Sequence, residues 1–191
     1  MKMSIFVIII CLVMAACLCA SAETKEQPDA WGPETQGCRF SATSDRASYR
    51  FDQSIRLCLT LKNENNELAV VRQSHVFLAY RFDVRLPNGT PAPLTLEGKR
   101  QMDASSAGGS MFGITLKRGQ SHIDEVPMLN RLYDMTMIGE YTVTVRRQVS
   151  IPRVLKPGEE RKPAVPFDVV SNTLKIVVHD QDVKKSNQQK P

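Results

Sequence analysis

Two short segments place histidine beside carboxylate side chains, which are the residue types that bind metal ions or exchange protons. Residues 122–125 read His-Ile-Asp-Glu, and residues 179–182 read His-Asp-Gln-Asp. Neither segment has the H-E-x-x-H spacing that puts two histidines on one face of a helix. The third histidine, His75, is far from both. We therefore interpret both segments as solvated strand ends and predict no metal site.

Other catalytic patterns are missing the residues they need. Ser110 follows two glycines but lacks the G-x-S-x-G turn that exposes a nucleophile. Residues 104–110 are rich in serine, alanine and glycine and are predicted to form a flexible loop, with no helix after it to complete a phosphate cradle. The carboxylates are scattered, with no apolar pocket in view to shift a pKa. The sequence predicts no catalytic residue, no cofactor and no enzyme.

Residues 152–166 combine prolines with four basic side chains, which make this segment a candidate interaction loop. The basic residues are Arg153, Lys156, Arg161 and Lys162. Proline lowers the entropy lost on binding, and the positive charges suit an acidic partner or a polysaccharide. Loops between the last strands of a sandwich often carry recognition. A solvated spacer is the simpler interpretation of the same composition.

The N-terminus has the three parts of a secretory signal peptide. Lys2 precedes an uncharged apolar run over residues 5–16, and small residues end at Ala22 before a polar stretch. The run is shorter than the roughly 18–20 residues that a spanning helix needs. We expect cleavage after Ala22. The alternative is a lipoprotein signal, because residues 14–17 resemble a lipobox, and Cys17 would then carry a lipid anchor.

The charge and the size of the chain limit its partners and its organisation. The formal net charge of +5 is spread along the sequence, so it favours solubility and does not indicate nucleic-acid binding. The part that remains after residue 22 has the size of one domain, and it can bury a core without a disulfide. Contact with a membrane is expected only through lipidated Cys17.

Between the ends of the chain, hydrophobic residues recur with a period of two. The clearest predicted strand covers residues 75–86, where six alternate positions are apolar, and it ends in an Asn-Gly pair typical of a type I′ hairpin turn. Shorter strands are predicted over residues 56–61, 68–71, 112–116, 141–151 and 174–178. Arg147 interrupts the apolar positions of residues 141–151. A helical turn is predicted only at residues 129–135. About seven or eight strands indicate an all-β sandwich.

Two cysteines, Cys38 and Cys58, remain outside the signal peptide. The alternation of each predicted strand puts Cys38 on its apolar face and Cys58 on its polar face. Side chains on opposite faces of a sheet cannot reach the short distance that a disulfide requires. We therefore expect both thiols to be free.

Residues 139–145 read G-x-Y-x-V-x-V, which resembles the late strand of fibronectin type III and other immunoglobulin-like domains. The resemblance implies that Tyr141 hydrogen-bonds back to upstream backbone. Residues 82–89, 116–119 and 139–141 are similar in order and spacing to the bacterial intracellular proteinase-inhibitor family, and to exported proteins that share its domain plan. The similarity covers about residues 31–180. It implies a fold and carries no catalytic residues.

The predicted organisation is a signal peptide (1–22), a flexible lead-in (23–35), one immunoglobulin-like antiparallel β-sandwich (36–180) and a disordered polar tail (181–191). The favoured function is an exported, non-enzymatic binding or structural module of the bacterial cell envelope, either secreted or periplasmic. Its partner would be a protein or a polysaccharide of the envelope. One alternative is a proteinase inhibitor that acts through an exposed loop. The last is a small metal-dependent or hydrolytic enzyme.

Overall fold

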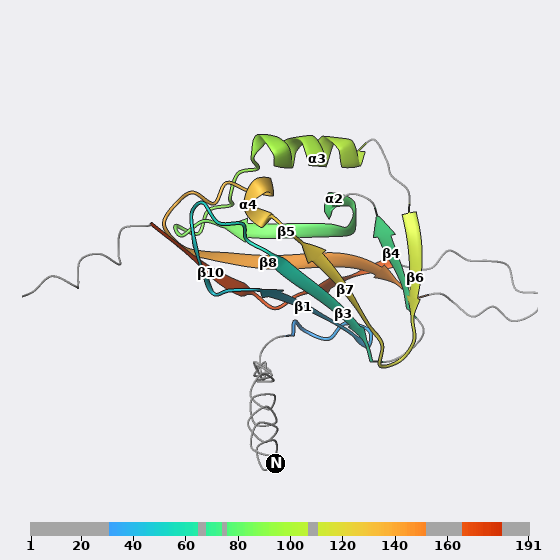
Figure 1. Cartoon of the computed structure of the whole chain (residues 1–191). Coiled ribbons are helices and arrows are strands. Elements are labelled where there is room, and N and C mark those ends of the chain that lie inside the picture. Colours follow the sequence, from blue (N-terminus) through green and yellow to red (C-terminus); the bar gives the residue numbers. More distant parts are fainter. Residues whose placement is uncertain (1–30, 65–67, 74–75, 107–110, 152–165, 181–191) are drawn as a thin grey trace, which may run out of the picture.

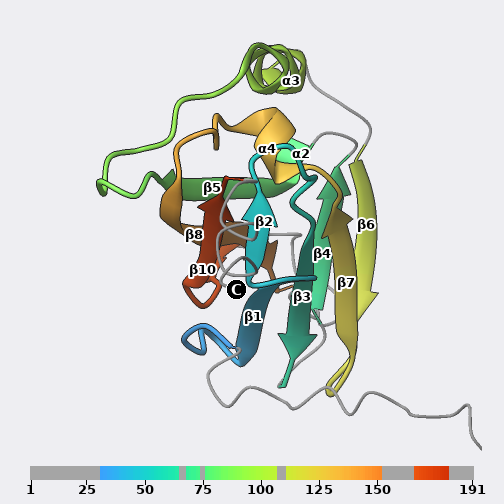
Figure 2. The same ribbon diagram turned by 60° about the vertical axis from the view of Figure 1, so that its left-hand side comes forward.

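The computed structural model describes residues 31–64, 68–73, 76–106, 111–151 and 166–180 (Figure 1). The predicted tail lies outside this part of the chain, and so do residues 1–30. The described residues form ten strands and three short helices. They are mostly β and the strands are divided between two sheets, which fits the predicted all-β sandwich (Figure 2). In this part of the chain, no helix has the length and apolar character needed to span a bilayer.

The first sheet has three antiparallel strands in the order β1-β3-β7. They are β1 (Cys38–Ser44), β3 (Leu57–Asn63) and β7 (Ser121–Val126). Every second residue of β3 from Leu57 onward is buried, which confirms the alternation predicted for residues 56–61. Strand β7 lies at one edge of this sheet.

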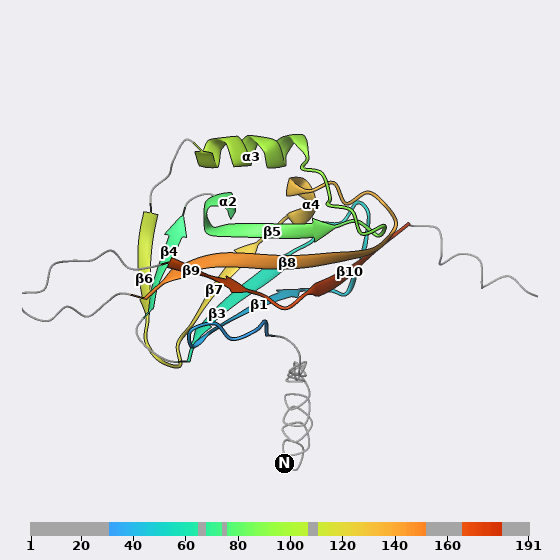
Figure 3. The same ribbon diagram turned by 180° about the vertical axis from the view of Figure 1, so that it is seen from behind.

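The second sheet is built around one long strand, β8 (Gly139–Ser150). One side of β8 pairs with β10 (Leu174–His179) and β9 (Pro166–Val170), as Figure 3 shows. The other side pairs with β5 (Tyr80–Arg85) and, at one position, with β4 (Leu68–Gln73). The sheet is completed by β2 (Ser48–Arg50), parallel to β10, and by β6 (Met111–Leu116), antiparallel to β4.

The core lies between the inner faces of the two sheets. Tyr141, Val143 and Val145 of β8 are fully buried because alternate residues of a strand point to the same face. From the first sheet, Phe40 stacks on Tyr80 of the second, with 6.1 Å between ring centroids. Burying each such large side chain contributes about 1.5–3 kcal/mol, so these contacts hold the sheets together.

The predicted strand over residues 75–86 is wrong in its first third. Helix α2 occupies Val76–Ala79, and the strand begins at Tyr80. Tyr80 is paired with Arg147, and a few residues farther along β8 the pairing position is taken by β4, where Ala69 faces Ser150. Residues 76–79 are therefore not paired along β8. Apolar alternation alone does not show that the strand begins only at Tyr80.

Two further helices lie beside β5 and α2. Helix α4 (Leu129–Leu132) falls within the helical turn predicted at residues 129–135. Helix α3 (Leu96–Ser106) was not predicted, and it contradicts the flexible loop expected from residue 104 onward. Thr95 caps its start, since the Gly98 amide donates to Thr95 Oγ1 at 3.0 Å. Residues 107–110 of that loop lie outside the described residues.

The turn after β5 is also not the predicted type I′. Gly89 has a φ of +82°, whereas Asn88 stays out of the left-handed region that type I′ requires at both central residues. The Gly89 amide donates to Leu86 O at 2.8 Å, and Leu86 N donates to Thr90 O at 2.8 Å. Asn88 Oδ1 accepts from the Thr90 amide at 3.0 Å, a local bond that a right-handed conformation allows. The glycine is therefore a bulge residue after an ordinary turn.

The two cysteines lie on opposite faces of the first sheet, as the alternation predicts. Cys38 is buried and paired with Asn63, whereas half-buried Cys58 is paired with Thr43, and both thiols are free. Burial, with a smaller contribution from Glu34, raises the pKa of the Cys38 thiol to about 11. Cys38 is therefore a poor nucleophile at neutral pH.

A bulge between β9 and β10 fastens the edge of β1 to the second sheet. The Asn172 side chain accepts from the Ala42 amide at 2.8 Å and donates to the Ala42 carbonyl at 3.0 Å. Gly32, within the predicted lead-in, donates its amide to Phe40 O at 2.9 Å. A Cβ atom on Gly32 would lie 2.0 Å from the carbonyl oxygen of Val170, so this close approach needs glycine.

Candidate functional site

Most of the predicted site residues lie outside the described part of the chain. This holds for Cys17 and for the whole basic loop, Arg153, Lys156, Arg161 and Lys162. Tyr141 is described. It is fully buried on β8, and its hydroxyl donates to the carbonyl of Met137 at 2.8 Å, four residues upstream. Burial raises the pKa of Tyr141, and this hydrogen bond offsets part of the rise.

Four ionisable side chains meet inside the sandwich, where three strands from both sheets converge. Arg147 comes from β8, Tyr80 from β5, and Asp124 and His122 from β7. Arg147 Nη1 donates to Asp124 Oδ2 at 2.9 Å, and the Tyr80 hydroxyl donates to the same oxygen. His122 Nε2 lies 3.1 Å from that oxygen. The guanidinium carbon of Arg147 lies 4.8 Å from the centroid of the Tyr80 ring.

This cluster corrects the interpretation of residues 122–125 as a solvated strand end. The side chains of His122 and Asp124 are 12% and 9% exposed, and that of Arg147 is 1% exposed. His179 does lie at a strand end, with Nδ1 3.1 Å from the Asp180 carbonyl. Within the described residues, no group of three or more His, Cys, Asp or Glu side chains is placed to hold a metal ion.

The electrostatics of the cluster favour a charged Asp124. Burial alone raises the pKa of Asp124, because a carboxylate loses hydration inside a protein. Hydrogen bonds from Tyr80 and Arg147, with the charge of His122, outweigh that effect and lower the pKa below its usual value. Asp124 therefore stays ionised and pairs with Arg147 across the two sheets.

The cluster links strands of the two sheets through side chains that are largely buried. One signal in the sequence points to it, since Arg147 interrupts the apolar positions of its strand. The partner Asp124 is 23 residues away on another sheet, so spacing does not reveal it.

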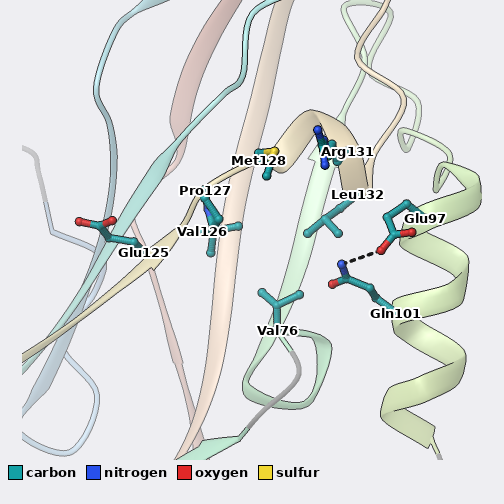
Figure 4. A pocket seen from close by; sticks show the side chains of 9 residues that line it. All are labelled: Val76, Glu97, Gln101, Glu125, Val126, Pro127, Met128, Arg131 and Leu132. Carbon is teal, nitrogen blue, oxygen red and sulfur yellow. Dashed lines mark hydrogen bonds between the residues drawn. The ribbon is translucent and has the colours of Figure 1, made fainter.

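An open cavity of about 210 Å³ lies between the helices and the end of β7 (Figure 4). Its apolar residues are Val76, Val126, Pro127, Met128 and Leu132, and its polar residues are Glu97, Gln101, Glu125 and Arg131. Gln101 Nε2 donates to Glu97 Oε1 at 3.1 Å on the wall formed by α3. Glu125 is exposed at the opposite rim, with its carboxylate directed away from α3. Sequence reasoning missed this cavity because three segments far apart in the sequence line it.

Close packing of α3 on α4 forms one wall of the cavity. Gly98 is buried, and a Cβ atom there would lie 2.1 Å from the carbonyl oxygen of Leu132. The Thr95 amide donates to the same carbonyl at 3.0 Å. Helix α3 otherwise buries little, with Leu96 70% exposed and Met102 42% exposed. Its position therefore depends on its first turn.

Comparisons with known proteins add no relative. No protein-family model, no curated protein and no solved structure matches the chain.

Proposed function

We propose that the chain is an exported, non-enzymatic binding module of the bacterial cell envelope with an immunoglobulin-like sandwich, and that it binds a protein partner at the cavity beside α3. In immunoglobulin-like domains the strands called A, B and E share one sheet, and C, F and G share the other. The orders β1-β3-β7 and β10-β8-β5 correspond to that division. The hydrogen bond of Tyr141 to Met137, just before the strand in the F position, adds support.

The observation that carries the binding proposal is the cavity itself. It is open to solvent and is lined by apolar side chains together with a few polar ones, which is the usual composition of a ligand site. Drug-sized ligands occupy about 300–1,000 Å³, so a cavity of about 210 Å³ suits one apolar side chain. An apolar anchor favours a protein partner over a polysaccharide.

The buried cluster supports a function without catalysis. The side chains best suited to acid–base work, His122 and Asp124, are committed to Arg147 and Tyr80 inside the sandwich. The cavity is lined instead by carboxylates, an amide and a guanidinium, which serve for recognition through hydrogen bonds and charge.

A capture experiment from envelope extract tests the proposal. Immobilised protein is compared with Gln101→Trp, which fills the cavity from α3, and with Met102→Trp, a matched control on the exposed side of the same helix. We expect Gln101→Trp to reduce capture of the partner at least about tenfold, equivalent to about 1.4 kcal/mol. We expect Met102→Trp to bind as the unaltered protein does.

Two results would contradict this proposal. One is that no envelope protein is captured at any salt concentration. The other is equal capture by the two tryptophan variants, which would place the partner elsewhere. Melting temperatures of both variants show whether each retains the fold.

A further inference from the structure

The edges of the two sheets differ in how they are protected against pairing with another strand. Edge strands carry backbone groups that can add a strand, and proteins usually cover or interrupt them. Strand β1 is covered by Asn172 and Gly32, β2 has three residues, and β6 has Gly113 in its interior. Within the described residues, strands β5 and β9 each pair with β8 alone, but Ala92 N donates to Val84 O on β5, and Gly32 lies against Val170 O on β9. Glycine inside a strand weakens pairing.

Strand β7 carries charges at Asp124 and Glu125, but no described backbone group bonds to its second edge. It has six residues, its one ladder partner in the described residues is β3, and Ile123 on its outer face is 60% exposed. No other described strand pairs with its second edge. In the described part of the chain, the backbone of this edge can therefore accept an added strand.

The edge leads directly into the cavity. Glu125 and Val126 are the last two residues of β7, and both line the cavity, as do Pro127 and Met128 immediately after them. A strand paired with β7 would therefore reach the cavity at its end. Backbone pairing gives such complexes affinity, and pockets for alternate side chains give them specificity.

We propose that the partner is an extended peptide segment that pairs antiparallel with β7 and inserts an apolar side chain into the cavity. This inference rests on the proposed function and names the class of partner. Antiparallel pairing is slightly more stable per residue than parallel pairing.

The alternation of β7 defines which residues the peptide needs. Buried Val126 and Asp124 point inward, whereas Ile123 and Glu125 point outward. The peptide residue opposite Val126 points into the cavity and is apolar. The next one faces Glu125 and is basic, and the third, opposite Asp124, is small. The fourth lies beside exposed Ile123 and is apolar. The motif is apolar-basic-small-apolar.

A synthetic peptide tests this motif directly. The probe is the capped, fluorescent octapeptide Ser-Thr-Leu-Lys-Thr-Val-Thr-Ser, titrated with the purified protein by anisotropy. We expect saturable binding that weakens at least tenfold with Gln101→Trp and with Ile123→Thr. The matched control is Ile138→Thr, which changes an isoleucine that is 58% exposed away from β7, and it should bind as the unaltered protein does.

A charge exchange tests the register. Glu125→Lys should weaken binding of the lysine peptide about tenfold, and a peptide with Glu in place of that Lys should restore it. No restoration would overturn the register and with it the motif. A probe that does not bind at all would overturn the motif.

Backbone methylation separates strand addition from binding in the cavity alone. Two octapeptides, N-methylated at alternate residues of one edge or of the other, are compared, because one of them cannot donate to β7. We expect the affinity of one methylated peptide to fall at least tenfold and the other peptide to bind as the parent peptide does. If both bind as the parent does and Gln101→Trp weakens both, strand addition is overturned while the proposed function stands. If capture from envelope extract fails, the proposed function itself fails.

Discussion

Arg147 and Asp124 form an ion pair between strands of different sheets, so this contact sets how the two sheets lie on each other. Its energetic role differs from that of the apolar core around it. Burying two charges is costly, and their attraction offsets that cost only while both partners are present. Tyr80 and His122 contact the same oxygen, Asp124 Oδ2, that accepts from Arg147.

Removing one partner of this pair should therefore destabilise the protein strongly. We expect Arg147→Met to lower the free energy of unfolding by about 3–5 kcal/mol, because Asp124 is left buried without its cation. The double variant Arg147→Met with Asp124→Leu should recover part of that loss. Urea denaturation measures both. A loss below about 0.5 kcal/mol for the single variant would show that the pair does not hold the sheets.

The lowered pKa of Asp124 predicts a specific loss of stability in acid. A carboxyl whose pKa is lower in the folded state contributes stability that is complete above its unfolded pKa, about 3.9. The contribution is lost as the pH falls through the folded value. The difference in unfolding free energy between the unaltered protein and Asp124→Asn should therefore shrink below about pH 4. Chemical denaturation from pH 6 to pH 3 measures it, and a difference that widens in acid contradicts the assignment.

At the scale of elements, alternation predicted the strands that have one buried face, and it failed where other contacts decide. Strands β3 and β8 were visible because their inward residues are apolar almost without interruption. Helix α3 was not, since its buried residues are only Gly98 and Ser105 and it has no apolar stripe. The strand predicted over residues 75–86 was wrong in its first third, because β4 takes the next pairing position on β8.

The candidate site was likewise predictable only in part from the sequence. Arg147 was visible as an interruption in β8, but its partner lies on a strand of the other sheet. The cavity could not be predicted, because three segments form it: α2, α3, and the stretch from the end of β7 to α4. Segments so far apart are brought together by tertiary packing, which periodicity does not encode.

The close contact of α3 with α4 gives a prediction at this scale. Gly98→Ala places a Cβ atom against the Leu132 carbonyl, so α3 must move away and the cavity must change shape. Alanine otherwise favours a helix over glycine by about 1 kcal/mol. We therefore expect weaker capture of the partner and a lower melting temperature. Gly113→Ala is the control, because a Cβ atom there meets no other atom within 4 Å. A Gly98→Ala protein with a higher melting temperature and unchanged capture of the partner would contradict the close contact between Gly98 and the Leu132 carbonyl.

At the scale of the whole molecule, the sequence predicts export and two alternative mature ends. Cleavage after Ala22 leaves a soluble module, whereas lipidation at Cys17 would tether it to a membrane. We expect mass spectrometry of the protein from an exporting bacterial host to give a chain that begins at Glu23. Cys17→Ser should not change that mass. A mature chain that begins at Cys17 with added acyl mass would replace this expectation with the anchored form.

The pairing of β2 with β10 has a mechanical consequence. These two strands run parallel, and one lies near the start of the described sandwich and the other at its end. Tension that pulls β2 and β10 in opposite directions along their length would load their three paired positions together in shear, rather than opening them one after another. The two hydrogen bonds between the Asn172 side chain and the Ala42 backbone would resist the separation of β1 from the second sheet. A chain pulled from both of its ends would therefore resist extension first where β2 pairs with β10.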